Sequence, residues 1–160
     1  KTLPGLRILE RYAVRTGGGY NHRFSLDEMV LIKDNHLKAA SYGSMASGIE
    51  EIIEMVKRKR PKNMPIEIEV KNLNEFRQAI RQKPNIIMLD NMDIEQIRKA
   101  VKIRDSLALS AKYNPKPKLE ASGNITLVNI KKYAQCGVDF ISIGSLSKDI
   151  DSLDISLDIL

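Results

Sequence analysis

The sequence predicts an α/β fold built on a parallel sheet. Short apolar or β-branched runs alternate along the chain with longer segments of helical periodicity, and most of the short runs end at polar residues. Strands separated by helices of this length imply right-handed crossovers and a parallel sheet, because parallel neighbours cannot be joined by a tight hairpin. In such a sheet the ligand site lies at the carboxyl ends of the strands, whether the sheet is open or closed into a barrel.

Five short runs have the character of buried strands. Alternation in the second run places Glu67 and Glu69 on one face of a strand and the β-branched residues on the other. The third run is apolar between Asn85 and Asp90, which indicates a strand buried on both faces. The tail, 152–160, alternates in polarity and favours a further edge strand. The five expected strands cover residues 29–32, 65–70, 85–90, 118–122 and 138–143.

Capping boxes mark the starts of several helices. In this pattern a Ser, Thr, Asn or Asp is followed three residues later by Glu or Gln, and the two side chains bond the first free N–H groups of a helix. We expect helices that begin at Ser47, Asn72 and Asp93, a short turn at Ser25, and further helices over 4–16 and 126–135.

Composition and charge narrow the possible classes of function. The net charge of +6 permits a nucleic acid, an acidic membrane surface or a phosphorylated metabolite as partner. The apolar stretches are only a few residues long, so we expect no membrane span. Aromatic residues make up 5% of the chain, and none lies within the basic run 57–60, which argues against a stacking platform for single-stranded nucleic acid.

The cysteine count bears on the redox compartment of the protein, and the first residues bear on whether the sequence is a fragment. The single cysteine, Cys136, excludes an internal disulfide and a zinc-binding cysteine cluster, which favours a reducing compartment. The chain begins at Lys1 rather than Met and has no apolar segment typical of a signal peptide. We therefore expect a fragment of a longer, cytoplasmic protein.

Two acidic residues end consecutive expected strands and are the first candidates for chemistry. Glu69 and Asp90 would lie at the same end of the sheet, where paired carboxylates could hold Mg²⁺ or stabilise developing positive charge. Strand-end acids can equally be solvated or cap the next helix. Glu67 shares a face with Glu69, and buried carboxylates are costly without cations. Lys1 and Lys33 are possible countercharges.

Cationic residues and small residues supply further candidates. His22 and Arg23 follow the glycine loop 17–19 and suit a carboxylate ligand, although such a pair is often structural. His36 could cap the next segment or brace Asp34. Two turns at strand ends, 122–124 and 142–145, have small residues that let backbone N–H groups approach a phosphate, although glycine there can be a loop requirement alone.

Several motifs together carry a resemblance to a known family. In chain order they are KTLPGLR (1–7), GGG (17–19), NHR (21–23), LIKDNH (31–36), EIEV (67–70), MLDNM (88–92), EASGNI (120–125) and GVD (137–139). Over nearly the whole chain they closely resemble the quinolinate phosphoribosyltransferase family, the carboxylating nicotinate-nucleotide pyrophosphorylases.

The resemblance implies a fold, an activity and partners. The fold would be a parallel (β/α) barrel of the phosphoribosyltransferase type, present as an incomplete fragment. Residues 1–160 would be the C-terminal catalytic domain, without the N-terminal domain and the first part of the barrel, and poorly active alone. The full protein would be a homodimer or a higher oligomer, without nucleic-acid or membrane partners. With Mg²⁺ it would transfer the 5-phosphoribosyl group of phosphoribosyl pyrophosphate to quinolinate and release CO₂, in de novo NAD synthesis.

The resemblance also implies roles for individual residues. The pocket for the quinolinate carboxylates and a neighbouring phosphate would comprise Lys1, His22, Arg23 and Lys33. Glu69 and Asp90 would lie near the ribose and the metal, and the catalytic residues would be Lys1, Glu69 and Asp90. The turns that hold the 5-phosphate would contain Ser122, Gly123, Asn124 and Gly144.

Two other functions remain open at this point. A nicotinate phosphoribosyltransferase or the molybdenum-transport-associated homologue would use the same barrel, but quinolinate has two carboxylates and suits the cations at 22–23 and 33 better. A noncatalytic phosphate- or nucleic-acid-binding module would use the net positive charge. Glu67, Glu69 and Asp90 oppose the second function, because they would repel a polyanion that lacks a metal.

Overall fold

The computed structural model describes residues 2–42, 48–108, 115–149 and 154–159. The chain forms two compact units, one of Lys1–His22 with Ile143–Leu160 and the other of Arg23–Ser142. The second unit contains the sheet and most of the predicted site residues.

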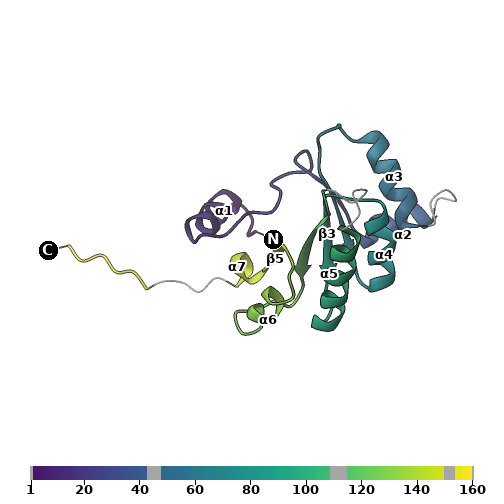
Figure 1. Cartoon of the computed structure of the whole chain (residues 1–160). Coiled ribbons are helices and arrows are strands. Elements are labelled where there is room, and N and C mark those ends of the chain that lie inside the picture. The colour runs from purple at the N-terminus through teal and green to yellow at the C-terminus, as the bar shows by residue number, and fades with distance from the viewer. Residues whose placement is uncertain (1, 43–47, 109–114, 150–153, 160) are drawn as a thin grey trace. The chain divides into compact units, whose positions relative to one another are not determined.

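The sheet of the second unit has five parallel strands in the order of the sequence (Figure 1). This order is typical of a (β/α) barrel, whereas a doubly wound sheet reverses direction at a switch point. The predicted α/β class with a parallel sheet is therefore confirmed, and the strands form a barrel segment that is open at β1 and β5. The strands are β1 (Val30–Ile32), β2 (Ile66–Val70), β3 (Ile86–Asp90), β4 (Lys118–Ser122) and β5 (Phe140–Ser142).

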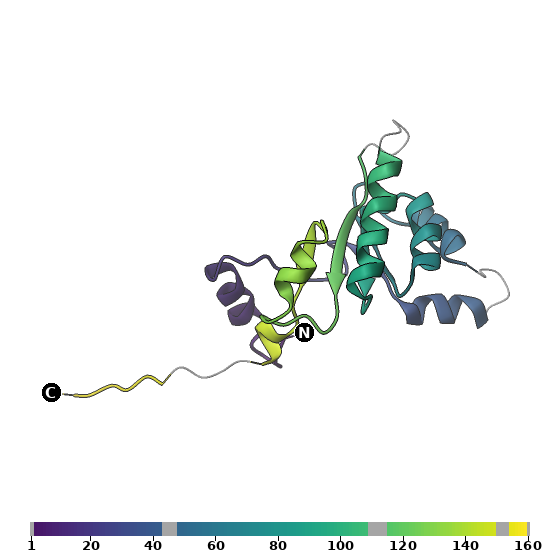
Figure 2. The ribbon, with the colours of Figure 1, turned by 60° about the horizontal axis from the view of Figure 1, so that its bottom comes forward.

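The two faces of the sheet differ in chemistry. Ile68, Ile87 and Leu119 are fully buried on one face, and helices pack against it. Among them, α4 (Leu73–Arg81) and α5 (Ile94–Ala108) lie side by side in Figures 1 and 2, and α4 contacts both β2 and β3. The other face, called the polar face below, carries glutamate side chains. Glu69 on β2 and Glu120 on β4 share this face, because both lie in register with Met88 on β3. The helices of this unit are α2 (Asp34–Tyr42), α3 (Ile49–Lys59), α4 (Leu73–Arg81), α5 (Ile94–Ala108) and α6 (Ile130–Ala134).

Two of the predicted capping boxes are present. The side chain of Asn72 accepts hydrogen bonds from the N–H groups of Asn74 and Glu75 at 3.0 and 2.9 Å. Asp93 accepts from the Gln96 N–H at 2.8 Å, and the Gln96 side chain accepts from the Asp93 N–H at 3.2 Å. Ser47 lies outside the described residues, and the N-cap of α3 is Gly48.

Three local predictions differ from the structure. Helix α2 was not predicted, and it starts directly after β1, where His36 Nδ1 accepts from the Lys33 N–H at 3.0 Å. Helix α6 is shorter than the predicted 126–135, because Asn129 accepts the Thr126 N–H at 2.8 Å and forms a turn before the helix. The predicted edge strand at 152–160 is wrong for residues 154–159, which are exposed and lack the backbone ladder that a strand requires.

The described residues of the first unit include the helices α1 (Arg7–Thr16) and α7 (Ser145–Lys148). Helix α1 confirms most of the helix predicted over 4–16, and it ends at the glycine loop as expected. Gly18 has a φ of +83°, a left-handed conformation that glycine adopts without strain, and its N–H donates to the Arg15 carbonyl at 3.0 Å. Among the described residues, no helix has both the length and the apolar composition that a bilayer span requires.

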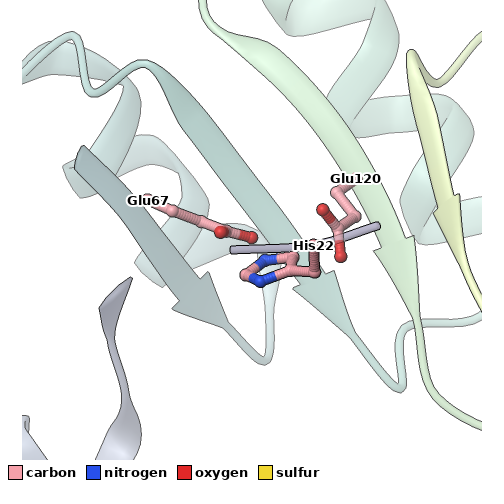
Figure 3. Close-up of side chains that lie close together, drawn as sticks. All are labelled: His22, Glu67 and Glu120. Carbon is pink, nitrogen blue, oxygen red and sulfur yellow. The ribbon is translucent and has the colours of Figure 1, made fainter. Parts of the chain in front are cut away.

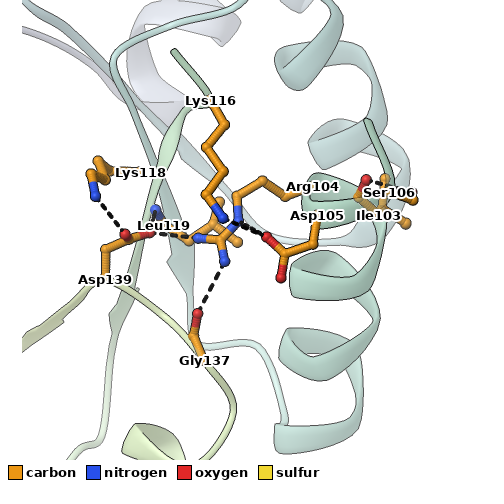
Figure 4. A network of polar contacts seen from close by, with 9 residues as sticks. All are labelled: Ile103, Arg104, Asp105, Ser106, Lys116, Lys118, Leu119, Gly137 and Asp139. Carbon is orange, nitrogen blue, oxygen red and sulfur yellow. Dashed lines mark hydrogen bonds and ion pairs between the residues drawn. The ribbon is translucent and has the colours of Figure 1, made fainter. Parts of the chain in front are cut away.

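A buried ion pair joins α5 to the amino ends of β4 and β5 (Figure 4). Arg104 is 4% exposed, and its guanidinium contacts Asp139 at 2.5 Å and the Gly137 carbonyl at 3.2 Å. Asp139 also accepts hydrogen bonds from the Leu119 N–H and the Lys118 ammonium, both at 2.9 Å. Burial would raise the pKa of Asp139, but these donors and Arg104 outweigh it and hold the pKa below its usual value. This network lies at the end of the sheet opposite to the predicted site.

We expect Asp139→Asn to lower the free energy of unfolding by about 2 kcal/mol at pH 7, because it leaves the buried Arg104 charge without its main partner. Since the native pKa of Asp139 is lowered, its contribution is complete above the unfolded pKa of about 4 and is lost as the pH falls through the native value. The difference between the two proteins should therefore shrink below pH about 4, as measured by urea unfolding.

Asp105→Asn is the matched control for this measurement. Asp105 also pairs with Arg104, but its side chain is 47% exposed, so we expect a loss below about 1 kcal/mol. Equal losses in the two variants would contradict the role assigned to Asp139.

Candidate functional site

Two acidic side chains lie at the carboxyl ends of β2 and β3, as predicted. The Glu69 side chain is 13% exposed, and Lys33 Nζ is 3.7 Å from its Oε2 atom. Burial raises the pKa of Glu69, the charge of Asp90 raises it further, and Lys33 opposes both effects. Glu69 and Asp90 therefore repel each other more than the neighbouring lysine compensates, which makes this edge of the sheet receptive to a cation.

Lysines beside the acids balance part of this charge. Lys71 directly follows β2, and its ammonium contacts Asp34 Oδ2 at 2.6 Å. The hydrogen bond from Lys71 lowers the pKa of Asp34, and the charge of Lys71 also acts on Glu69. Positive charge is thus concentrated at the ends of β1 and β2, beside the acidic pair.

Two further glutamates lie on the polar face of the sheet, inside the strands rather than at their carboxyl ends. Figure 3 shows Glu67 on β2 and Glu120 on β4, with side chains on the same side of the sheet. Glu67 is 0% and Glu120 is 3% exposed, and Ser142 on β5 donates a hydrogen bond to Glu120 Oε1 at 2.5 Å. Alternation had placed Glu67 and Glu69 on one face, and the register of β2 confirms that arrangement.

The turn after β4 contains three of the predicted phosphate-binding residues. Asp90 pairs in register with Ser122, so this turn lies beside the end of β3. Gly123 and Asn124 have φ values of +98° and +51°, so the chain reverses sharply. A Cβ atom on Gly123 would lie 2.3 Å from Asn91 Oδ1, so glycine is required both by the backbone and by its neighbour.

The predicted cationic pocket is only partly in this unit. Arg23 is half-buried, and its Nη1 donates to the Met29 carbonyl at 2.7 Å, which fixes the guanidinium beside β1. His22 and Gly144 belong to the first unit, where the His22 carbonyl accepts from Arg11 at 2.8 Å and Gly144 precedes α7. Lys1 lies outside the described residues.

A divalent cation suits the acidic pair chemically. Glu69 and Asp90 offer carboxylate oxygens, which Mg²⁺ prefers, on adjacent strands. Burial and the charge of Asp90 both raise the pKa of Glu69, so a cation beside the pair would stabilise its ionised form. The donor set and its charge are therefore suited to Mg²⁺ or to a metal-bound phosphate.

Sequence reasoning missed three residues of this region. Lys71 and Asn91 each directly follow a predicted strand, so their position was the signal that could have identified them. Ser142, which supports Glu120, was considered only as part of a glycine turn.

Comparison with known proteins identifies the family. Residues 1–158 match the sequence model of the C-terminal domain of quinolinate phosphoribosyl transferase. A probable carboxylating nicotinate-nucleotide pyrophosphorylase of Methanocaldococcus jannaschii is 46% identical over all of this chain and 53% of its own length. The corresponding protein of Mycobacterium leprae is 40% identical over 99% of this chain and 51% of its own length.

A solved structure agrees with the sequence matches. The nicotinate-nucleotide pyrophosphorylase of Francisella tularensis superposes with a TM-score of 0.82 at 42% identity, over 97% of this chain and 50% of that one. The chain thus spans about half the length of the relatives it matches. From its sequence match over residues 1–158 and this shared fold, the chain belongs to the quinolinate phosphoribosyltransferase family.

Proposed function

We propose that the protein transfers the 5-phosphoribosyl group of phosphoribosyl pyrophosphate to the ring nitrogen of quinolinate. The ring nitrogen forms a bond to C1′ of the ribose while the bond from C1′ to pyrophosphate breaks. The carboxylate next to the ring nitrogen then leaves as CO₂, its bonding electrons stay on the ring carbon, and that carbon takes up a proton. The product is nicotinate mononucleotide. These 160 residues would form the C-terminal catalytic domain of the protein.

The observation that carries this proposal is the order of side chains along the carboxyl edge of the sheet. Lys33 lies at the end of β1, Glu69 and Asp90 at the ends of β2 and β3, and the turn 122–124 at the end of β4. The product has the same order of groups, namely a pyridine carboxylate, a ribose and a 5-phosphate. Lys33 would thus contact the pyridine carboxylate, the two acids would contact the ribose, and the turn 122–124 would contact the 5-phosphate.

The acidic pair would act on the ribose. When the bond to pyrophosphate breaks, positive charge develops at C1′ and the ring oxygen, and nearby carboxylates stabilise it. Glu69 and Asp90 are suited to this role because they already repel each other before the substrate arrives. Their mutual repulsion would be relieved as the cationic transition state forms.

Cations would bind the quinolinate carboxylates. Arg23 has a planar guanidinium that is fixed by the Met29 carbonyl and has further N–H groups available for a carboxylate. Lys33 directly follows β1, and its ammonium, 3.7 Å from Glu69 Oε2, would neutralise the second carboxylate. The family resemblance also assigns Lys1 and His22 to the quinolinate carboxylates and Gly144 to the 5-phosphate, and these assignments stay predictions.

Mg²⁺ belongs to the same proposal. Glu69 and Asp90 would hold it through their carboxylate oxygens, directly or through the pyrophosphate. When bound, the ion would neutralise charge that develops on the departing pyrophosphate. The full-length protein would also be a homodimer or a higher oligomer, would be cytoplasmic, and would use no nucleic-acid or membrane partner.

We expect calorimetry on the full-length protein to detect quinolinate and to discriminate against nicotinate, which has one carboxylate fewer. Arg23→Ala should weaken quinolinate binding at least about 30-fold, because it removes one partner of a charge pair that the ligand buries. Arg58→Ala is the matched control, since Arg58 lies in the last turn of α3 and should leave binding unchanged. Equal binding of nicotinate, or binding of neither acid, would contradict the proposal.

We expect the pKa of Glu69 to respond in opposite directions to two substitutions. Asp90→Asn removes a repelling charge and should lower the pKa, whereas Lys33→Ala removes the opposing cation and should raise it. NMR titration of side-chain carboxyl carbons in the full-length protein measures both shifts. Glu95→Gln, in an exposed pair with Lys99, should leave Glu69 unchanged. A Glu69 pKa that is the same in both site variants would exclude the electrostatic coupling described above.

A further inference from the structure

We infer that Asn91 is a positioning residue whose side chain couples the Asp90 carboxylate to the turn 122–124. The inference rests on the proposed function, which assigns Asp90 to the ribose and this turn to the 5-phosphate of the same substrate. Asn91 would then set the spacing between the two groups that hold phosphoribosyl pyrophosphate.

The backbone of Asn91 departs from the strand that precedes it. Its φ is +53°, in the left-handed region that non-glycine residues rarely adopt. Its N–H donates to the Ser122 carbonyl at 2.8 Å, so the contact between β3 and β4 extends one residue beyond Asp90. Asparagine adopts this region more readily than most residues because its short side chain can bond nearby groups, and here the side chain bonds Asp90 and Asn124.

Both the nitrogen and the oxygen of the Asn91 side-chain amide form hydrogen bonds. Nδ2 donates to Asp90 Oδ1 at 3.0 Å, and Oδ1 accepts from Asn124 Nδ2, also at 3.0 Å. A carboxylate at this position could not donate to Asp90, and an aliphatic side chain could make neither bond. The amide therefore connects an acid on one strand to the phosphate turn of the next.

The turn is shaped to receive this amide. Besides the 2.3 Å approach to Oδ1, a Cβ atom on Gly123 would lie 2.5 Å from Asn91 Cγ. From the other side, Asn129 Nδ2 donates to the Asn124 carbonyl at 3.0 Å. Gly123 and Asn124 are thus held between two asparagines, and only Asn91 also contacts an acid of the site.

This arrangement predicts a loss that is specific to one substrate. Phosphoribosyl pyrophosphate would contact both Asp90 and the turn, so it should lose affinity when their connection is removed. Quinolinate would bind beside Arg23 and Lys33, near β1, so its affinity should not change.

The main test uses Asn91→Gly in the full-length protein, because glycine accepts the left-handed φ and removes only the side chain. We expect the dissociation constant of ribose 5-phosphate and the KM of phosphoribosyl pyrophosphate to rise about tenfold. The dissociation constant of quinolinate should stay within about twofold of wild type, and the melting temperature should not fall.

Asn91→Asp provides a second, independent readout. It retains an acceptor for Asn124 but cannot donate a hydrogen bond to Asp90. The KM of phosphoribosyl pyrophosphate should therefore rise as it does in Asn91→Gly, while the dissociation constant of quinolinate stays within about twofold of wild type. Lys83→Gly is the control, since Lys83 has a φ of +51° at an exposed position beyond α4 and should change none of these quantities.

Two results would overturn the inference while the proposed function stands. One is an Asn91→Gly protein with wild-type affinity for ribose 5-phosphate. The other is an equal loss for both substrates together with a lower melting temperature, which would show a structural role alone. A wild-type protein that forms no nicotinate mononucleotide would instead refute the proposed function, and this inference with it.

Discussion

The alternation of side chains across a parallel sheet is the constraint on which the rest of this structure depends. Because helices cover one face, residues such as Ile68, Ile87 and Leu119 must be apolar, and every second residue is released from that requirement. The released positions are Glu67, Glu69 and others on the polar face. Parallel pairing in sequence order then brings the carboxyl ends of all five strands to one edge.

The same constraint explains what could be predicted from the sequence. Strand positions follow from apolar runs, and the shared face of Glu67 and Glu69 follows from a period of two. The helix starts at Asn72 and Asp93 follow from side chains that bond nearby backbone groups, so they depend on only a few consecutive residues. Each of these features is local, and local chemistry is what a single sequence records directly.

The features that were missed depend on distant partners or on unusual backbone. The tail at 154–159 alternates like a strand, but alternation alone supplies no neighbouring backbone to pair with. The pairing of Lys71 with Asp34 joins segments that are far apart in the chain. The left-handed backbone of Asn91 and its fit over Gly123 become visible only when β3 and β4 lie side by side. For the site, the sequence supplied the acids and the turn but not the contacts between them.

Charge at the carboxyl edge links the fold to the proposed chemistry. Burial raises the pKa of Glu69, the charge of Asp90 on the adjacent strand raises it further, and Lys33 at 3.7 Å compensates only in part. A fold that needed only stability would gain by replacing such a pair with apolar residues. At this edge of the sheet the imbalance instead favours a partner that carries or develops positive charge between β2 and β3. The charges of Arg104 and Asp139 at the opposite end are paired and hydrogen-bonded, whereas the acids at the carboxyl ends are only partly balanced, which is the arrangement that the proposed binding of a cationic group requires.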